Sequence, residues 1–273
     1  MSMTEQEASS RRRYYQKVCQ EIQQESEALA IEYSKRHRGK APRNDWKREL
    51  SRLIDLVGRH HATRMKDVSL RTLASRRETL FLAFEELREA GFKPQSIFSF
   101  GSKHAEALFS RWEEKGLSAA TLQTRHTILS TFCGWIGKNG LIRPLPHYLK
   151  NPQNGKRTYV AQHDKSWSAQ NVMTDELIAR ITEYDRYVGM QLKLIQAFGL
   201  RRKEAVCFRP HICLEADGQH IQVYQGTKGG RFRVIPIQTE SQRAILQEAQ
   251  ALCRRHHDHV GDPNNTLEQN IRR

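Results

Sequence analysis

The sequence has no cysteine pair at metal-binding spacing, no long apolar run and no phosphate-loop motif. Its five cysteines are scattered and odd in number, and no two have the C-x-x-C spacing, so neither a zinc ribbon nor a disulfide framework is predicted. Free thiols of this kind suit a reducing cytoplasm. No apolar stretch approaches the roughly 18 residues of a membrane helix. The start of the chain, "MSMTEQEASSRRRYYQ", lacks the apolar segment of a signal peptide.

Acidic residues are scarce relative to basic ones. The 273 residues include 45 Lys plus Arg against 30 Asp plus Glu, which gives a formal net charge of +15. A clustered excess of this size favours a polyanionic partner, and nucleic acid comes first among such partners. The alternative is a basic surface that serves solubility alone. The length allows one large domain or two ordinary ones.

Residues 1–45 are polar and basic and are expected to form an N-terminal arm. A helix is predicted to run into a cationic segment, Lys35 to Lys40, and to be broken by Gly39 and Pro42. Two interpretations remain open for the arm: a solvated extension, or an extension that contacts DNA.

Residues 46–145 have the periodicity of a helical bundle. Helices are predicted to end at Gly91, at Gly116 and near Gly140, and one is predicted to begin after an N-cap at Ser118. The apolar stripes form the core. The opposite faces carry cations that are expected to be free to contact a DNA backbone, namely Arg76, Arg77, Lys103, Arg111, Arg125 and Lys138.

Residues 146–172 read as a linker, because prolines, Gly155 and cations occur there without a sustained period. A different pattern follows over 173–273. Helices are predicted from an N-cap at Thr174, over roughly 186–198, and over "RKEAVCF". Two β-branched runs, "HIQVYQ" and "RFRVIPI", are joined by "GTKGG" and predict a hairpin. An amphipathic helix comes after it.

Two short stretches of this region contain candidate functional residues, although each is weak alone. The turn "GTKGG" carries Lys228 and fits either an anion nest or a plain tight turn. The stretch "FGLRRKEA" places Arg201 and Arg202 after a helix, where an arginine is common.

The order of the elements is more specific than either stretch. A helix, "FGLRRKEA", a strand, "GTKGG", a strand ending in "RVIPI" and another helix together resemble the catalytic domain of the tyrosine recombinases, the phage-integrase family. The resemblance covers roughly residues 65–250 and is closest to integrases of bacterial mobile elements. It implies that Arg201 is the first catalytic arginine, with Glu204 at the matching acidic position. It also implies that Lys228 is the catalytic lysine.

The resemblance implies a fold and roles for further residues. The fold is mainly α with a small β-hairpin: a SAM-like helical core-binding domain over 46–145 and a partial α+β catalytic domain over 173–273. Arg201 clamps the attacked phosphate, Lys228 protonates the leaving 5′ oxygen, and Glu204 orients its neighbours. DNA-backbone contacts are expected from Arg202, Lys203, Arg231 and Arg233.

This sequence departs from the family pattern after the hairpin. The family also has an H/K-x-x-R segment, a further His or Trp and a nucleophilic tyrosine there. Here no histidine after Lys228 has an arginine three residues on, and no tyrosine follows Tyr224. A truncated catalytic domain is therefore expected, in a chain that binds DNA but does not cleave it alone. A metal site in "RRHHDHVGD" is disfavoured, because histidines in so polar a stretch are usually solvated.

The expected partner is double-stranded DNA of the attachment-site type, with self-association on DNA and neither membrane, metal nor cofactor. The expected location is the bacterial cytoplasm, in association with the nucleoid. One alternative is a non-catalytic DNA-binding fragment or accessory factor. Another is an RNA-binding protein, which is disfavoured because no RNA-recognition signature with paired aromatics occurs.

Overall fold

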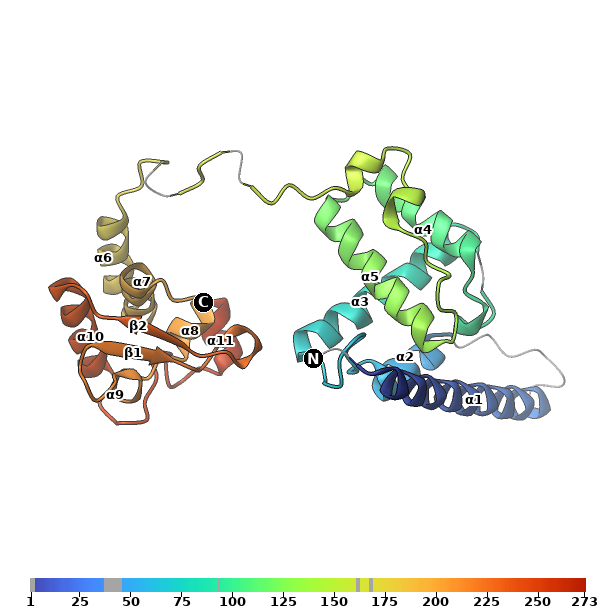
Figure 1. Cartoon of the computed structure of the whole chain (residues 1–273), viewed down its shortest axis with the longest axis horizontal. Coiled ribbons are helices and arrows are strands. Elements are labelled where there is room, and N and C mark those ends of the chain that lie inside the picture. Colours follow the sequence, from blue (N-terminus) through green and yellow to red (C-terminus); the bar gives the residue numbers. More distant parts are fainter. Residues whose placement is uncertain (1–2, 37–45, 93, 161–162, 167–168) are drawn as a thin grey trace. The chain divides into compact units, whose positions relative to one another are not determined.

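The chain forms two compact units, residues 1–160 and 161–273. The computed structural model describes residues 3–36, 46–92, 94–160, 163–166 and 169–273. In these residues the structure is mainly helical, with one two-stranded sheet (Figure 1), which confirms the predicted fold class. Gly39, Pro42 and most of the cationic segment predicted before them lie outside the described residues.

Unit 1 is a bundle of five described helices joined by turns and short 3-10 segments. The helices are α1 (Glu5–Arg36), α2 (Trp46–Val57), α3 (Leu70–Glu89), α4 (Ser102–Glu114) and α5 (Ala119–Trp135), and the 3-10 turns are η1 (Ile97–Ser99), η2 (Leu145–His147) and η3 (Pro152–Gly155). Ser118 caps α5 as predicted, because its hydroxyl accepts the backbone N–H of Thr121 at 3.3 Å.

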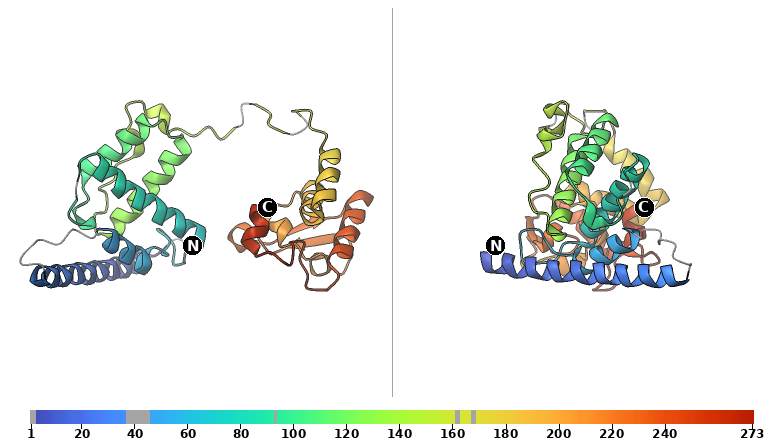
Figure 2. Two further views of the ribbon diagram at one scale, coloured as in Figure 1. Left: turned by 180° about the vertical axis from the view of Figure 1, so that it is seen from behind. Right: turned by 90° about the vertical axis from the view of Figure 1, so that its right-hand side faces the viewer.

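Helix α1 is part of this bundle. It lies alongside α2 (Figures 1 and 2) and also contacts α5. Val18 and Ile22 are buried against the core, where each contributes about 1.5–3 kcal/mol from burial. The Arg11 guanidinium donates to the carbonyl of His61 at 2.6 Å. The predicted arm thus does not form a separate segment over its helical part, because its own apolar residues complete the core of unit 1.

Two boundaries of unit 1 differ from the predicted ones. Helix α5 ends at Trp135, earlier than predicted, because Gly137 takes a left-handed conformation with φ of 77°. The start of the predicted linker is folded onto α5. Leu149 is buried there, and the Gln123 amide donates to the carbonyl of Gly155 at 2.7 Å.

Unit 2 combines the hairpin with six described helices. The helices are α6 (Thr174–Tyr184), α7 (Arg186–Phe198), α8 (Arg202–Val206), α9 (Pro210–Cys213), α10 (Glu240–Leu252) and α11 (Leu267–Arg272). Thr174 is the first residue of α6 and not its N-cap, which is Met173. Helix α7 packs against α6, α8 and α10, and its buried residues Met190, Leu194 and Phe198 form the centre of the core.

The sheet of unit 2 consists of β1 (His220–Val223) and β2 (Arg233–Pro236), which pair antiparallel with His220 opposite Pro236 and Val223 opposite Arg233. The connecting loop therefore spans residues 224–232, and it is longer than the "GTKGG" turn. Lys228 begins a 3-10 turn (η4, Lys228–Gly230) within this loop.

Candidate functional site

The stretch "FGLRRKEA" forms a sharp junction between α7 and α8. Gly199 ends α7 in a left-handed conformation, with φ of 60°, and its N–H donates to the carbonyl of Ile195. Leu200 is buried in the core, so the chain is anchored directly before Arg201. Arg201 then occupies the N-cap position of α8. The junction exposes the Arg201 side chain at the start of a helix while its backbone is held in place.

Glu204 lies at the centre of the predicted site. Its side chain is 0% exposed and accepts the backbone N–H of Arg201 at 2.8 Å, which completes a capping interaction. One carboxylate oxygen, Oε1, also accepts from Nη1 of Arg201 at 2.6 Å. The other, Oε2, accepts from Nη2 of Arg233 at 2.5 Å. A buried carboxylate thus joins two guanidinium groups from different elements.

The charge of Glu204 is favoured by these bonds. Burial alone raises the pKa of the Glu204 carboxyl, since desolvation disfavours its charged form. The Arg201 backbone N–H, the Arg201 guanidinium and the Arg233 guanidinium act in the opposite direction, and together they hold the pKa below its ordinary value. Glu204 is therefore ionised at neutral pH and is suited to orienting its two arginine partners.

The lysine hairpin packs closely against this junction. Gly226, at the start of the loop, has φ of 73°, and a Cβ placed on it would lie 2.6 Å from the carbonyl oxygen of Lys203. Only glycine fits such an approach. The loop that carries Lys228 is therefore in direct contact with α8, and Arg233 ties the following strand to the same helix through Glu204.

The exposed surface of the α7–α8 junction and the Lys228 loop is cationic. The Arg201 side chain is 59% exposed, and Arg202, Lys203, Lys228 and Arg231 are exposed as well. Within the described residues, no hydrogen bond or ion pair is formed by the Lys228 ammonium group. Such a surface is suited to binding phosphate groups.

Arg233 is placed differently from its sequence prediction. We expected it on the exposed surface as a DNA-backbone contact, but its side chain is 36% exposed and pairs with Glu204. Its Nε atom is buried. The paired carboxylate and the packing of the loop draw this guanidinium inward.

Three of the cations predicted to lie free on unit 1 are engaged by the protein. Arg76 is only 6% exposed, because its Nη1 donates to the carbonyls of Gly58 at 2.6 Å and His60 at 2.8 Å. The guanidinium of Arg125 stacks on Trp112 at 4.7 Å. The ammonium group of Lys138 donates to the carbonyls of Phe98 and Phe100. The prediction that these three side chains are free to contact DNA is therefore wrong.

The remaining predicted cations of unit 1 are more accessible. Lys103 is exposed on α4. Arg77 pairs with Asp55 and also donates to the hydroxyl of Ser51 at 3.1 Å. Arg111 pairs with Glu89 at 2.5 Å. Surface ion pairs of this kind contribute little to stability, so these arginines can exchange a carboxylate for a phosphate.

A second cationic surface on unit 1 was not predicted. The loop between α2 and α3 exposes the cations Arg59, Arg64 and Lys66, and Arg71 is exposed in the first turn of α3. The Arg11 guanidinium of α1 donates to the carbonyl of Arg64 at 3.1 Å. The pKa of His61 is lowered by burial and then by the positive charges of neighbours that include Arg64 and Lys66. The charge run "GRHHATRMK" was a sequence signal for this loop.

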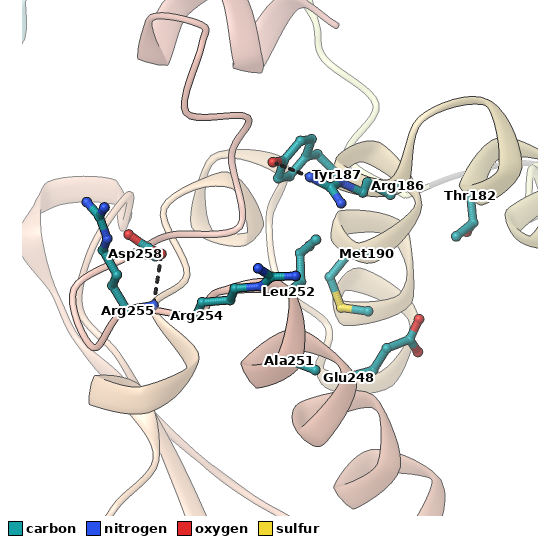
Figure 3. Close-up of a pocket in the computed structure, with 10 residues that line it drawn as sticks. All are labelled: Thr182, Arg186, Tyr187, Met190, Glu248, Ala251, Leu252, Arg254, Arg255 and Asp258. Carbon is teal, nitrogen blue, oxygen red and sulfur yellow. Dashed lines mark hydrogen bonds between the residues drawn. The ribbon is translucent and has the colours of Figure 1, made fainter.

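The pocket drawn in Figure 3 is separate from the predicted site. It has a volume of about 580 Å³ and lies where the first turns of α7 face the end of α10. Arg186, Arg254 and Arg255 line it, with Met190 and Leu252 among its apolar walls. Arg201 follows the other end of α7, which is about 20 Å away along a helix of this length. None of the predicted site residues lines this pocket.

Metal ligation has no support in the part of the chain that the structure describes, where no three His, Cys, Asp or Glu side chains are grouped closely enough to hold an ion. The His211 imidazole lies within hydrogen-bonding distance of the Cys253 carbonyl, at 2.7 Å. Neighbouring His256 stacks on it. These histidines cover the end of α10.

Comparison with known proteins supports the arrangement found in unit 2. Residues 156–264 match the sequence model of the family described as Integrase. No curated protein matches the chain. None of the described helices combines the length and the apolar character needed to cross a membrane. The matched segment begins close to the division between the units and includes Arg201, Glu204 and Lys228. The matched residues, which make up most of the carboxy-terminal unit, are therefore an integrase domain of the phage, or tyrosine recombinase, type.

Proposed function

We propose that the chain binds duplex DNA as the integrase of a mobile element, with Arg201 as the phosphate clamp of its active site. The observation that carries this proposal is the buried Glu204 carboxylate, which holds Arg201 beside the lysine hairpin. A guanidinium held on one edge by a carboxylate keeps its other donors available for a phosphate oxygen.

The proposed chemistry follows from the charge that develops at the attacked phosphate. A tyrosine that has lost its phenolic proton forms a bond to phosphorus through its oxygen, and the bond from phosphorus to the 5′ oxygen breaks. Between these two states the phosphorus centre carries extra negative charge on its non-bridging oxygens. Arg201 stabilises that charge. The leaving oxygen takes a proton from Lys228, which acts as a general acid. Glu204 does not transfer a proton and serves to orient Arg201.

The 273 residues supply only part of this chemistry. No tyrosine follows Tyr224 in the sequence, and the family resemblance places the nucleophile after the hairpin. We therefore expect these residues to bind DNA without forming a covalent bond to it on their own. A second subunit that lends a tyrosine would still leave the H-x-x-R groups to be supplied.

The test uses tag-free protein and a labelled duplex. Affinity is expected to fall steeply with salt, with the logarithm of the binding constant changing by about 0.9 per phosphate contact for each unit of log salt. Arg201→Gln is expected to weaken binding, whereas Arg180→Gln, which removes an exposed charge of α6, serves as the control. Equal affinity of the two variants would contradict the proposed role of Arg201.

Cleavage is tested separately on nicked suicide duplexes that carry sequences selected for binding from a random library. No covalent adduct is expected with this chain alone, and a trapped phosphotyrosine adduct would overturn that expectation. Adding a segment with H-x-x-R and tyrosine in trans is expected to restore cleavage. An unchanged result would favour the accessory-factor alternative, in which the same surface only holds DNA.

The remaining parts of the proposal concern the partner and the setting. DNA of the attachment-site type, self-association on that DNA and a location at the bacterial nucleoid are proposed from the integrase resemblance. Competition between duplex DNA and structured RNA at matched salt distinguishes the RNA-binding alternative. A preference for RNA would count against the DNA partner, the self-association on DNA and the location at the nucleoid.

A further inference from the structure

Glu204 is shared between two arginines from elements that are distant in sequence. Arg201 lies at the start of α8 and Arg233 on β2, and each donates to a different oxygen of the same carboxylate. The carboxylate has no exposure to solvent. A buried charge of this kind depends on all of its partners for its position and ionisation.

The two arginines differ in their access to a ligand. Arg201 is 59% exposed and uses Nη1 for Glu204, which leaves its Nη2 and Nε edge available. Arg233 uses Nη2 for Glu204, and its Nε is buried. Arg201 is thus available to a phosphate, whereas the Arg233 guanidinium is directed to Glu204 and its side chain is less exposed, at 36%.

Building on the proposed role of Arg201, we propose that Arg233 is a positioning residue of the active site and not a direct DNA contact. Through Glu204 it fixes the carboxylate that orients the Arg201 guanidinium. Through its own backbone in β2 it ties the Lys228 loop to α8. The two groups that act on the phosphate are thereby held by one ion triad whose shared carboxylate is buried, in addition to the packing of Gly226 on Lys203.

The test is a double-mutant cycle on duplex-DNA affinity. Arg201→Gln is expected to weaken binding about tenfold, the loss of one charge-assisted contact. Arg233→Gln is expected to weaken it similarly, because the Arg201 side chain loses its orientation. The double variant is expected to bind about as weakly as Arg201→Gln alone, since Arg233 acts through Arg201. Additive losses in the cycle would overturn the proposal.

Arg231→Gln is the matched control. Arg231 is exposed and lies two residues before Arg233 in the same segment, so its replacement removes the same charge from nearly the same place. Its loss is expected to add to that of Arg201→Gln and to reduce the salt dependence by about one contact. Arg233→Gln in the Arg201→Gln background is expected to leave the salt dependence unchanged, and a reduction there would identify Arg233 as a direct contact.

The effect of Glu204→Gln on DNA affinity has opposite signs if Glu204 acts only through the protein's overall charge and if it positions the arginines. Removing a negative charge strengthens DNA binding if Glu204 acts only through the general field of the protein. The positioning role predicts weaker binding, because the neutral amide holds the two guanidinium groups less firmly. Stronger binding by this variant would contradict the positioning role.

A measurement without DNA separates the failure of this proposal from the failure of the proposed function. NMR relaxation of the Arg201 Nε–H group is expected to show greater side-chain motion in Arg233→Gln than in wild type or Arg231→Gln. Arg233→Lys, which keeps a cation beside Glu204, is expected to restore part of the order. If wild type does not bind duplex DNA, the proposed function fails. If the Arg201 side chain moves no more in Arg233→Gln than in wild type, the positioning role is wrong, whether or not DNA binds.

Discussion

Glu204 links two elements of unit 2 through its bonds to Arg201 and Arg233. Its pKa is lowered in the folded protein: burial opposes ionisation, but the Arg201 N–H and the two guanidinium groups outweigh it. A carboxyl with a folded pKa below the unfolded value of about 4.3 stabilises the fold fully above that pH. The stabilising contribution is lost as pH falls through the folded pKa.

Acid sensitivity of the α7–α8 junction should therefore depend on Glu204. Hydrogen exchange of peptides that cover 199–208, corrected for intrinsic rates, is expected to show loss of protection as pH falls below about 4.3 in wild type. In Glu204→Gln this pH-dependent change should be smaller, because the amide does not titrate. Equal pH profiles in the two proteins would rule out Glu204 as the source.

The order of the elements and the family resemblance predicted Arg201, Glu204 and Lys228 as a group, but the sequence did not predict how arginines divide between surface and interior. Arg76 and Arg77 are adjacent in sequence, yet one is buried on the carbonyls of Gly58 and His60 and the other pairs with Asp55 at the surface. Side-chain periodicity cannot distinguish these positions. The choice depends on unpaired backbone carbonyls at the end of α2, and these arise only in the folded bundle.

At the scale of elements, the contact between the lysine hairpin and α8 depends on one glycine. Gly226→Ala is expected to destabilise unit 2, because its Cβ would meet the Lys203 carbonyl at 2.6 Å and the positive φ disfavours any side chain. Gly230→Ala is the control: it has φ of 71° but no atom within 4 Å of its Cβ, so it costs only about 1–2 kcal/mol of backbone strain.

Urea unfolding followed by circular dichroism measures both variants, and native-state proteolysis of the 224–232 loop measures the local effect. Gly226→Ala should lose more stability than Gly230→Ala in urea, and its loop should be cleaved faster. Equal losses would show that strain alone, without the contact to α8, determines the stability of this loop.

Helix α1 is the second element with a testable role. Ile22→Ala removes a side chain that is 2% exposed and is expected to destabilise unit 1 by about 2–5 kcal/mol. Ile31→Ala lies on the same helix, but Ile31 is 57% exposed, so a change within about 0.5 kcal/mol is expected. Unfolding monitored by the buried tryptophans of unit 1 compares the two. Similar stability of both variants would mean that α1 does not contribute to the core.

The elements themselves were largely predictable, whereas their ends and attachments were less so. Glycines with left-handed backbone follow α3 and α4 at the predicted positions, Gly91 and Gly116. The end of α5 was misplaced, because the apolar stripe continues to Ile136 beyond the residue where Gly137 turns the chain. The packing of α1 was also missed, since only Val18 and Ile22 of its 32 residues are buried. So sparse an apolar face is hardly distinguishable from a solvated helix.

At the scale of the whole molecule, the two units divide the charge unequally. Most of the excess of basic residues lies in unit 1, whereas unit 2 has a cationic surface at the α7–α8 junction and the hairpin. Cations of both units are therefore expected to contribute to the proposed salt dependence of DNA binding. The double-mutant cycle at Arg201 and Arg233 measures the coupling between two residues of unit 2 alone.

The hydrogen bond from the Met3 N–H to the Thr63 carbonyl, at 3.0 Å, bears on how protein for these measurements is prepared. It holds the beginning of α1 against the loop that carries Arg64 and Lys66. A purification tag fused before Met3 would emerge beside this cationic loop, and a polyhistidine tag there would add titratable charge next to a surface suited to phosphates. A tag at that end should be cleaved off before any affinity is compared between variants.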